Sequence, residues 1–286
     1  MGKWPTCCGI SCSLLTGNVR LLEHQAKQLL SEFGIPVPRG LVCRDAEAAA
    51  AAWDQIGAAA GGVVLKAQVP IGKRGKGGDV SVVRSRAHAE DTASALLQMT
   101  VGGFAVTEIL AEELVPISAE LYLSVLTDTS PAHPRPLLMI SARGGMDIEE
   151  LAAAAPDSLY RLHADPAYGL HPYQARELAR SSGLSVEGQG ALTKIIGATY
   201  RAYWESDAEL LEINPLALTT AGDLVAVDAK VTIDNAARGG HTEIKGGEKD
   251  SVETRAAAMG LSYVELEGDI GPVSYTHLTL PTNYSV

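Results

Sequence analysis

The chain has 286 residues, of which 46% are hydrophobic, 20% charged and 5% aromatic, and its formal net charge at pH 7 is −11. This composition is typical of a globular protein of one or two domains, and no apolar run reaches the roughly 18 residues of a membrane span. The acidic balance excludes a nucleic-acid surface, because binding a duplex requires a basic face, so we expect neither nucleic acid nor membrane as a partner.

The first residues differ from the rest of the chain. Residues 1–18 show no amphipathic period, yet they hold Cys7, Cys8 and Cys12, three of the four cysteines. This cysteine usage implies no disulfide framework and fits a reducing compartment, so we expect a cytoplasmic protein. No further Cys or His follows at the spacing of a metal site. We expect residues 1–18 to be a leader outside the fold, with translation beginning near Val19.

The first regular element is a helix. Leu22, Ala26, Leu30 and Phe33 recur at helical spacing, and the sequence Gly-Ile-Pro at 34–36 ends the helix. A short strand at 40–42 is expected to follow.

The next stretch, residues 63–83, reads as a hairpin with a basic, glycine-rich loop. β-Branched residues fill both ends and glycines fill the middle. Lys66, Lys73, Arg74 and Lys76 are four of the 23 basic residues of an acidic chain, so the loop locally reverses the overall charge. Glycine allows backbone N–H groups to approach an anion closely while Lys and Arg neutralise it, which favours a polyphosphate ligand.

The familiar phosphate motifs do not describe this loop. A Walker loop would need glycine at Pro70 and Ser or Thr at Gly77. A dinucleotide fingerprint would need a G-x-G-x-x-G order followed by a helix, whereas a strand follows here. Taken alone, the loop is also compatible with the solvated tip of a charged hairpin.

The remaining pattern alternates helices and strands. The predicted helices are 87–99, 144–155, 173–180 and 189–205, the last with Leu192, Ile195, Ile196 and Tyr203 on one face. The predicted strands are 104–110, 119–126 and 136–141, with a turn at 130–134, and a final hairpin joins 209–218 to 224–231. Strands joined by hairpins, with helices between them, indicate an α+β fold rather than a parallel doubly wound sheet.

Polar side chains face each other across the final hairpin. Glu212 and Asn214 are two residues apart and therefore share one face of their strand. If the loop has three or five residues centred on Ala221, the antiparallel register places Asn214 opposite Asp228. Hard oxygen ligands of this kind suit Mg²⁺, which takes one or two carboxylates and leaves its other positions to water and phosphate. The alternative is the polar face of a surface hairpin.

A basic phosphate loop together with an acidic metal hairpin is the combination that phosphoryl transfer requires. With these features the chain resembles the β subunit of succinate–CoA ligase, whose N-terminal part is an ATP-grasp fold with two α+β lobes around a nucleotide cleft. The resemblance rests on motifs in the order of the family: LEHQAK (22–27), KAQV (66–69), RGKGG (74–78), ELY (120–122), GGMDIE (144–149), PYQAREL (172–178), EINPL (212–216) and GDIG (268–271).

The resemblance implies a phosphate-binding role for the first hairpin. Lys66 resembles the family lysine on the nucleotide phosphates, and Lys73, Arg74 and Gly75 stand at the Gly-Arg-Gly loop. Two departures affect this loop. Lys73 replaces its first glycine, and the pair Pro-Ile at 70–71 replaces His-Ala. A Cβ at position 73 opposes the usual close approach of the backbone, while the added charge compensates.

The resemblance also implies where the rest of the nucleotide and its metal lie. Glu112 and Val115 fall where the chain between the lobes passes the adenine and ribose, and Glu120 is the acidic residue beyond them. Asn214 and Asp228 match the Mg²⁺ ligands of the family.

The implied reaction is the reversible coupling of ATP to succinyl-CoA formation in the tricarboxylic acid cycle. Pro38 matches the ATP-using members, so ATP and ADP are expected rather than guanine nucleotides. The phosphoryl-carrier histidine and most CoA contacts of the family lie on a separate α subunit. We therefore assign no catalytic residue to this chain and expect the α subunit, CoA and succinate or a similar dicarboxylate as partners.

Two other functions fit the same residues. Malate–CoA ligase and other ADP-forming acyl-CoA synthetases share the grasp domain, and the sequence does not fix the acid. A non-catalytic nucleotide-binding or interaction module is a different class, favoured if Lys73 prevents phosphate binding.

The resemblance sets the expected domain organisation. An ATP-grasp domain is expected at 19–245, and the start of a linker to a flavodoxin-like CoA-ligase domain at 246–271. We expect that domain to be missing, because residues 272–286 show no period of a helix or strand and resemble translated sequencing-adaptor DNA. On this interpretation the chain is a fragment with an artefactual tail, which binds nucleotide but is inactive alone.

Overall fold

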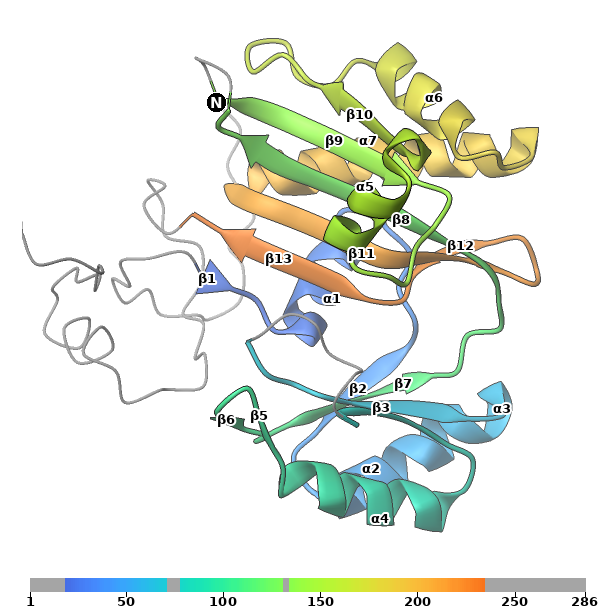
Figure 1. Ribbon diagram of the computed structural model, residues 1–286. Helices are drawn as coiled ribbons and strands as arrows, with labels where there is room; N and C mark the ends of the chain where they lie inside the picture. The colour runs from blue at the N-terminus through green and yellow to red at the C-terminus, as the bar shows by residue number, and fades with distance from the viewer. Residues whose placement is uncertain (1–18, 71–77, 131–133, 235–286) are drawn as a thin grey trace, which may run out of the picture.

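The computed structural model describes residues 19–70, 78–130 and 134–234. The expected leader (1–18), linker (246–271) and tail (272–286) lie outside these ranges, as does the end of the expected domain. The described residues form two lobes, a large one above and a small one below, with helix α1 between them (Figure 1). No helix within these ranges is both long and apolar enough to span a membrane.

The large lobe is built on a seven-stranded antiparallel sheet with the order β1-β13-β11-β8-β9-β10, in which β12 also pairs with β11. Strands β8 and β11 lie at its centre, and their inward side chains, such as Leu123 and Ile213, are fully buried. The strands are β1 (Val19–Arg20), β8 (Ile117–Asp128), β9 (Arg135–Ser141), β10 (Leu159–His163), β11 (Ala208–Thr219), β12 (Leu224–Ala226) and β13 (Ala229–Ile233).

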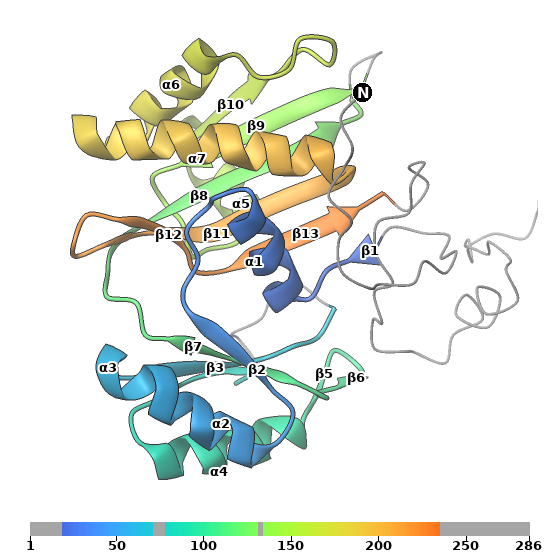
Figure 2. The same cartoon turned by 180° about the vertical axis from the view of Figure 1, so that it is seen from behind.

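Helices cover both faces of this sheet. Helices α1, α6 and α7 pack on one face, seen in Figure 2, and α5 lies on the other, seen in Figure 1. The helices are α1 (Glu23–Glu32), α5 (Ile148–Ala154) with the short turn η2 (Pro156–Ser158), α6 (Pro172–Ser181) and α7 (Val186–Glu205). The predicted apolar face of the longest helix, α7, is confirmed, because all four of its named residues are buried in the core.

The small lobe has a four-stranded antiparallel sheet with the order β2-β7-β3-β4, and helices cover its outer face (Figure 1). The predicted hairpin at 63–83 is confirmed, because β3 and β4 pair with Val63 opposite Val83 and Lys66 opposite Val80. The elements are β2 (Gly40–Cys43), α2 (Ala46–Ala52), η1 (Trp53–Gly57), α3 (Ala58–Ala60), β3 (Val63–Ala67), β4 (Val80–Val83), α4 (Arg86–Leu97), β5 (Thr100–Val101), β6 (Phe104–Ala105) and β7 (Ile109–Glu113).

The structure differs from the predicted elements in several places. Strand β10 was not predicted, the helix expected from residue 144 begins at Ile148, and the strand expected at 224–231 is divided into β12 and β13. The single strand expected at 104–110 is wrong, because β6 pairs only with β5, and β7 begins at Ile109 in the other sheet. The break occurs where Val106 is buried and its N–H donates to Met99 O, which turns the chain back onto the end of α4. Sequence reasoning also missed the alanine-rich helix α2, which begins where the Asp45 side chain accepts a hydrogen bond from Ala48 N.

Candidate functional site

The final hairpin has the register that the sequence predicts. Leu216 pairs with Ala226 and Ile213 with Ala229, so Asn214 stands opposite Asp228. The N–H of Asn214 donates to the carbonyl oxygen of Asp228 at 3.2 Å. This register follows from the loop centred on Ala221, because such a loop fixes which residues of the two strands face each other.

The side chain of Asn214 holds a glycine turn of the large lobe in place. Its Oδ1 accepts from Gly145 N at 2.8 Å, and its Nδ2 donates to Met146 O at 2.9 Å. The same turn is tied to β8, because Gly144 N donates to Glu120 O at 2.8 Å. The structure therefore brings Asn214 and Glu120, two of the predicted site residues, to opposite sides of one turn.

Gly144→Ala is expected to lower the free energy of unfolding by about 2 kcal/mol. A Cβ at position 144 would overlap the backbone carbonyl of Leu121 on β8, so the whole turn must shift. Gly190→Ala on α7 is the matched control, because a Cβ there meets open space. In the control, the free energy of unfolding should be unchanged or should rise by up to about 1 kcal/mol, since alanine has a higher helix propensity than glycine. Urea denaturation of both variants tests this, and equal effects would contradict it.

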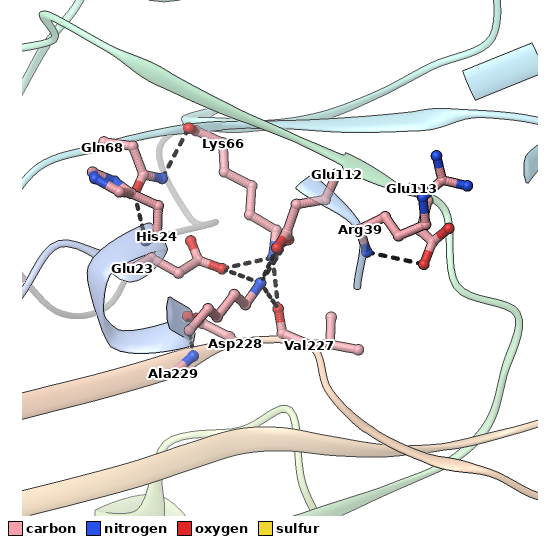
Figure 3. A network of polar contacts seen from close by, with 11 residues as sticks. Glu23, His24, Arg39, Lys66, Gln68, Glu112, Glu113, Val227, Asp228 and Ala229 are labelled. Atoms are coloured by element: carbon pink, nitrogen blue, oxygen red, sulfur yellow. Dashed lines mark hydrogen bonds and ion pairs between the residues drawn. The ribbon is translucent and has the colours of Figure 1, made fainter. Parts of the chain in front are cut away.

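A buried cluster of opposite charges joins the two lobes beside this hairpin. Lys66 comes from β3 and Glu112 from β7 of the small lobe, while Glu23 comes from α1 (Figure 3). Lys27 also comes from α1, one turn after Glu23. All four residues are at most 7% exposed. Sequence reasoning missed Glu23 and Lys27 as site residues, because their four-residue spacing on a helix is also that of an ordinary surface ion pair.

The contacts in this cluster are short and shared. Lys66 Nζ lies 2.8 Å from Glu23 Oε1 and 2.8 Å from Glu112 Oε2. Lys27 Nζ lies 2.8 Å from Glu23 Oε1 and 2.5 Å from Glu112 Oε1. Both ammonium groups also donate to the carbonyl oxygen of Val227, at 2.7 Å and 2.6 Å, just before Asp228 of the final hairpin (Figure 3). The cluster therefore connects the first hairpin, α1 and the final hairpin.

The environment moves the pKa values of the two lysines in opposite directions. Burial acts to lower the pKa of Lys66, but the carboxylates of Glu23, Glu112 and Asp228 outweigh it and raise this pKa above its ordinary value. The pKa of Lys27 is lowered, first by burial and then by the charge of Lys66. Lys66 is thus held firmly as a cation and lies within electrostatic reach of Asp228.

Further hydrogen bonds connect the segments around the cluster. Gln68 Nε2 donates to Lys66 O at 3.1 Å, and Gln68 Oε1 accepts from His24 N at 3.1 Å, which ties the end of β3 to the start of α1 (Figure 3). On the other side, Val115 is half-buried in the segment 114–116 between β7 and β8, where the chain passes from one lobe to the other. Thr220 N donates to Pro116 O at 2.9 Å and fixes this segment to the large lobe.

Part of the predicted site lies outside the described residues. Lys73, Arg74 and Gly75 belong to the segment 71–77, and only the strands that carry this loop are described. Of the predicted metal ligands, Asn214 lies on β11 and Asp228 lies opposite it, in the short break between β12 and β13. Asp228 Oδ1 accepts from Ala229 N at 2.8 Å. Within the described ranges, no three His, Cys, Asp or Glu side chains gather as a metal site of their own.

Comparison with known proteins identifies the class to which this fold belongs. The model of the ATP-grasp domain matches residues 20–218. Similar curated relatives include two proteins named as the β subunit of ADP-forming succinate–CoA ligase. That of Rubrobacter xylanophilus is 44% identical, covering 88% of this chain and 65% of the relative. That of Bacteroides thetaiotaomicron is 40% identical, covering 88% and 67%.

The chain belongs to the ATP-grasp family of succinate–CoA ligase β subunits, as its motifs predict. It spans about two thirds of the length of these curated relatives, 65% and 67%.

Solved structures share the fold at lower identity. The dinucleotide-forming acetyl-coenzyme A synthetase 1 of Ca. Korarchaeum cryptofilum superposes with a TM-score of 0.60 at 22% identity, covering 75% of this chain and 93% of that one. The ATP citrate lyase of Methanothrix soehngenii superposes with a TM-score of 0.61 at 19% identity, covering 83% and 58%. The α+β, two-lobed ATP-grasp fold expected from the sequence is thereby confirmed.

Proposed function

We propose that the chain binds Mg·ATP between its two lobes, as the nucleotide-binding part of an ADP-forming succinate–CoA ligase. The observation that carries this proposal is the position of Lys66, whose buried ammonium group lies where both lobes meet and close to Asp228. A cation fixed in this way offers charge-assisted hydrogen bonds to a polyphosphate. The names of the relatives, which describe ADP-forming ligases, support a nucleotide as the ligand.

In this proposal the first hairpin holds the phosphates and the crossing between the lobes receives the adenosine. Lys73, Arg74 and Gly75 follow β3 in the chain, and in this proposal they add cationic and backbone donors for the phosphates. Val115 lies in the crossing segment, next to the adenine and ribose, and Glu120 lies beyond it on β8. The carboxylate of Glu112 is engaged by the lysines, so its contribution is to hold the cleft rather than to contact the base.

Asn214 and Asp228 would hold the Mg²⁺ ion. The two residues stand opposite each other across the hairpin, and their amide and carboxylate oxygens are hard donors. A set of two protein ligands fits an ion that takes its other ligands from phosphate and water. When bound, Mg²⁺ neutralises charge on the phosphates during phosphoryl transfer. A solved neighbour of the same fold carries Mg-AMPPCP, which supports this metal in the fold.

The whole reaction requires groups beyond this chain. We propose that an α subunit supplies the phosphoryl-carrier histidine, and that CoA and succinate or a similar dicarboxylate are the other substrates. None of the histidines of this chain is assigned that role. They are His24, His88, His133, His163, His171, His241 and His277.

A ligand titration tests nucleotide binding directly. Mg·ATP should raise the melting temperature, because a ligand at one hundred times its Kd stabilises the folded state by about 2.7 kcal/mol. Mg·GTP should raise it less, and Mg²⁺ alone should have a small effect. If saturating Mg·ATP leaves both the melting temperature and the calorimetric heat unchanged, the proposed function is wrong.

Asp228→Asn is expected to raise the Mg²⁺ concentration needed for half-maximal ATP binding by about tenfold. The substitution keeps the shape of the side chain and removes the charge of one proposed ligand. Asp223→Asn is the matched control, because Asp223 is exposed in the loop of the same hairpin. Calorimetric titration of ATP at a series of Mg²⁺ concentrations measures the shift. If the titration curves of wild type and Asp228→Asn superimpose, Asp228 does not bind Mg²⁺ and the hairpin has only a structural role.

A further inference from the structure

Lys27 has no part in the function proposed above, yet it has the same acceptors as Lys66. Both ammonium groups contact Glu23 Oε1, the carboxylate of Glu112 and the carbonyl oxygen of Val227, all between 2.5 and 2.8 Å. Two cations therefore converge on two carboxylates in a buried place. Either lysine alone is within reach of every acceptor that the other uses.

Glu23 and Glu112 each contact both lysines, so the loss of Lys27 removes one cation from both carboxylates. Glu23 and Glu112 are each 2% exposed, and leaving a buried charge without a partner is costly. A phosphate group that draws the Lys66 ammonium toward itself removes that cation from the two carboxylates. Without a second cation, the carboxylates would hold Lys66 back and compete with the phosphate.

Lys27 is attached to a different lobe from Lys66. It projects from α1, whose residues Ala26 and Leu30 are fully buried in the core of the large lobe. Lys66 instead lies on β3, the strand that leads into the basic loop, and within electrostatic reach of Asp228. The charge of Lys66 also lowers the pKa of Lys27, so a shift of Lys66 away from the cluster removes this repulsion.

We propose that Lys27 is a positioning residue for nucleotide binding, which neutralises Glu23 and Glu112 and thereby frees Lys66 for the nucleotide phosphates. Lys27 itself does not touch the nucleotide. This inference rests on the proposed function, because it gives Lys66 a polyphosphate as its second partner. It assigns a role in ligand affinity to an ion pair that otherwise serves only to join α1 to the small lobe.

The first experiment compares three variants by calorimetric titration with Mg·ATP. Lys27→Met should weaken binding by about tenfold, since Lys66 then has to serve both carboxylates. The double variant Glu23→Gln/Lys27→Met restores the balance of charge and should bind within about threefold of wild type. Lys194→Met is the matched control, because Lys194 is exposed and lies on α7, which contributes no residue to the cluster. Adenosine, which has no phosphate, should bind Lys27→Met and wild type equally.

A second variant keeps the test decisive if Lys27→Met does not fold. Glu23→Gln alone removes one carboxylate that competes with phosphate for Lys66. This variant should therefore bind Mg·ATP at least as tightly as wild type does. A purely structural pair predicts the opposite, weaker binding by both single variants. Weaker binding by Glu23→Gln, or no recovery in the double variant, would overturn the proposal. If wild type itself does not bind Mg·ATP, the proposed function fails first, and this inference fails with it.

Discussion

Lys66→Met is expected to weaken Mg·ATP binding about a hundredfold or more, because a charge-assisted contact to phosphate contributes a few kcal/mol. The fold should survive, since Lys27 still neutralises part of the charge on Glu23 and Glu112. Calorimetric titration measures the affinity, and circular dichroism checks that the variant is folded.

Two comparisons make this result specific. Lys194→Met should bind like wild type, and Glu23→Gln should not rescue Lys66→Met, because the lost cation is the one that contacts phosphate. If the Lys66→Met variant is folded and binds Mg·ATP with the affinity of wild type, the phosphates do not bind at Lys66.

Glu112→Ala is expected to lower the free energy of unfolding by about 3–5 kcal/mol, the range for breaking a buried ion pair from one side. The carboxylate of Glu112 contacts both ammonium groups, so its loss deprives two buried cations of a shared carboxylate. Chemical denaturation in the absence of nucleotide measures the effect.

The neighbouring residue provides the control for this variant. Glu113 is also on β7, but its carboxylate accepts a hydrogen bond from Arg39 N at an exposed site, at 3.0 Å. Glu113→Ala should therefore cost about 1 kcal/mol or less. Equal losses for the two variants would show that the cluster does not contribute more than an exposed contact.

Local patterns in the sequence predict much of this fold. The two hairpins follow from β-branched runs on either side of turn residues, and the loop centred on Ala221 is enough to place Asn214 opposite Asp228. The apolar stripe of α7 gives its buried face directly. In contrast, the alanine-rich α2 has no stripe to detect, and the break after Ala105 depends on the burial of Val106 against α4.

The site itself is harder to predict, because its charged residues come from distant parts of the chain. Glu23 and Lys27 follow the pattern of an exposed helical pair, and only the packing of α1 between the lobes buries them. The carbonyl oxygen of Val227 leaves no signal in the sequence at all. The resemblance to a family places Lys66 and Asp228 at one site, but the shared acceptors of two lysines appear only in three dimensions.

The small lobe occupies one continuous stretch of the chain, residues 40–113, and its core lies entirely between Cys43 and Ala111. In the large lobe, the first and last of the described strands, β1 and β13, instead pair with each other, with Arg20 opposite Thr232. During synthesis the small lobe can therefore fold while most of the large lobe is still to be made, because all the buried residues of its apolar core are already translated. The sheet of the large lobe cannot be completed until β13 has left the ribosome.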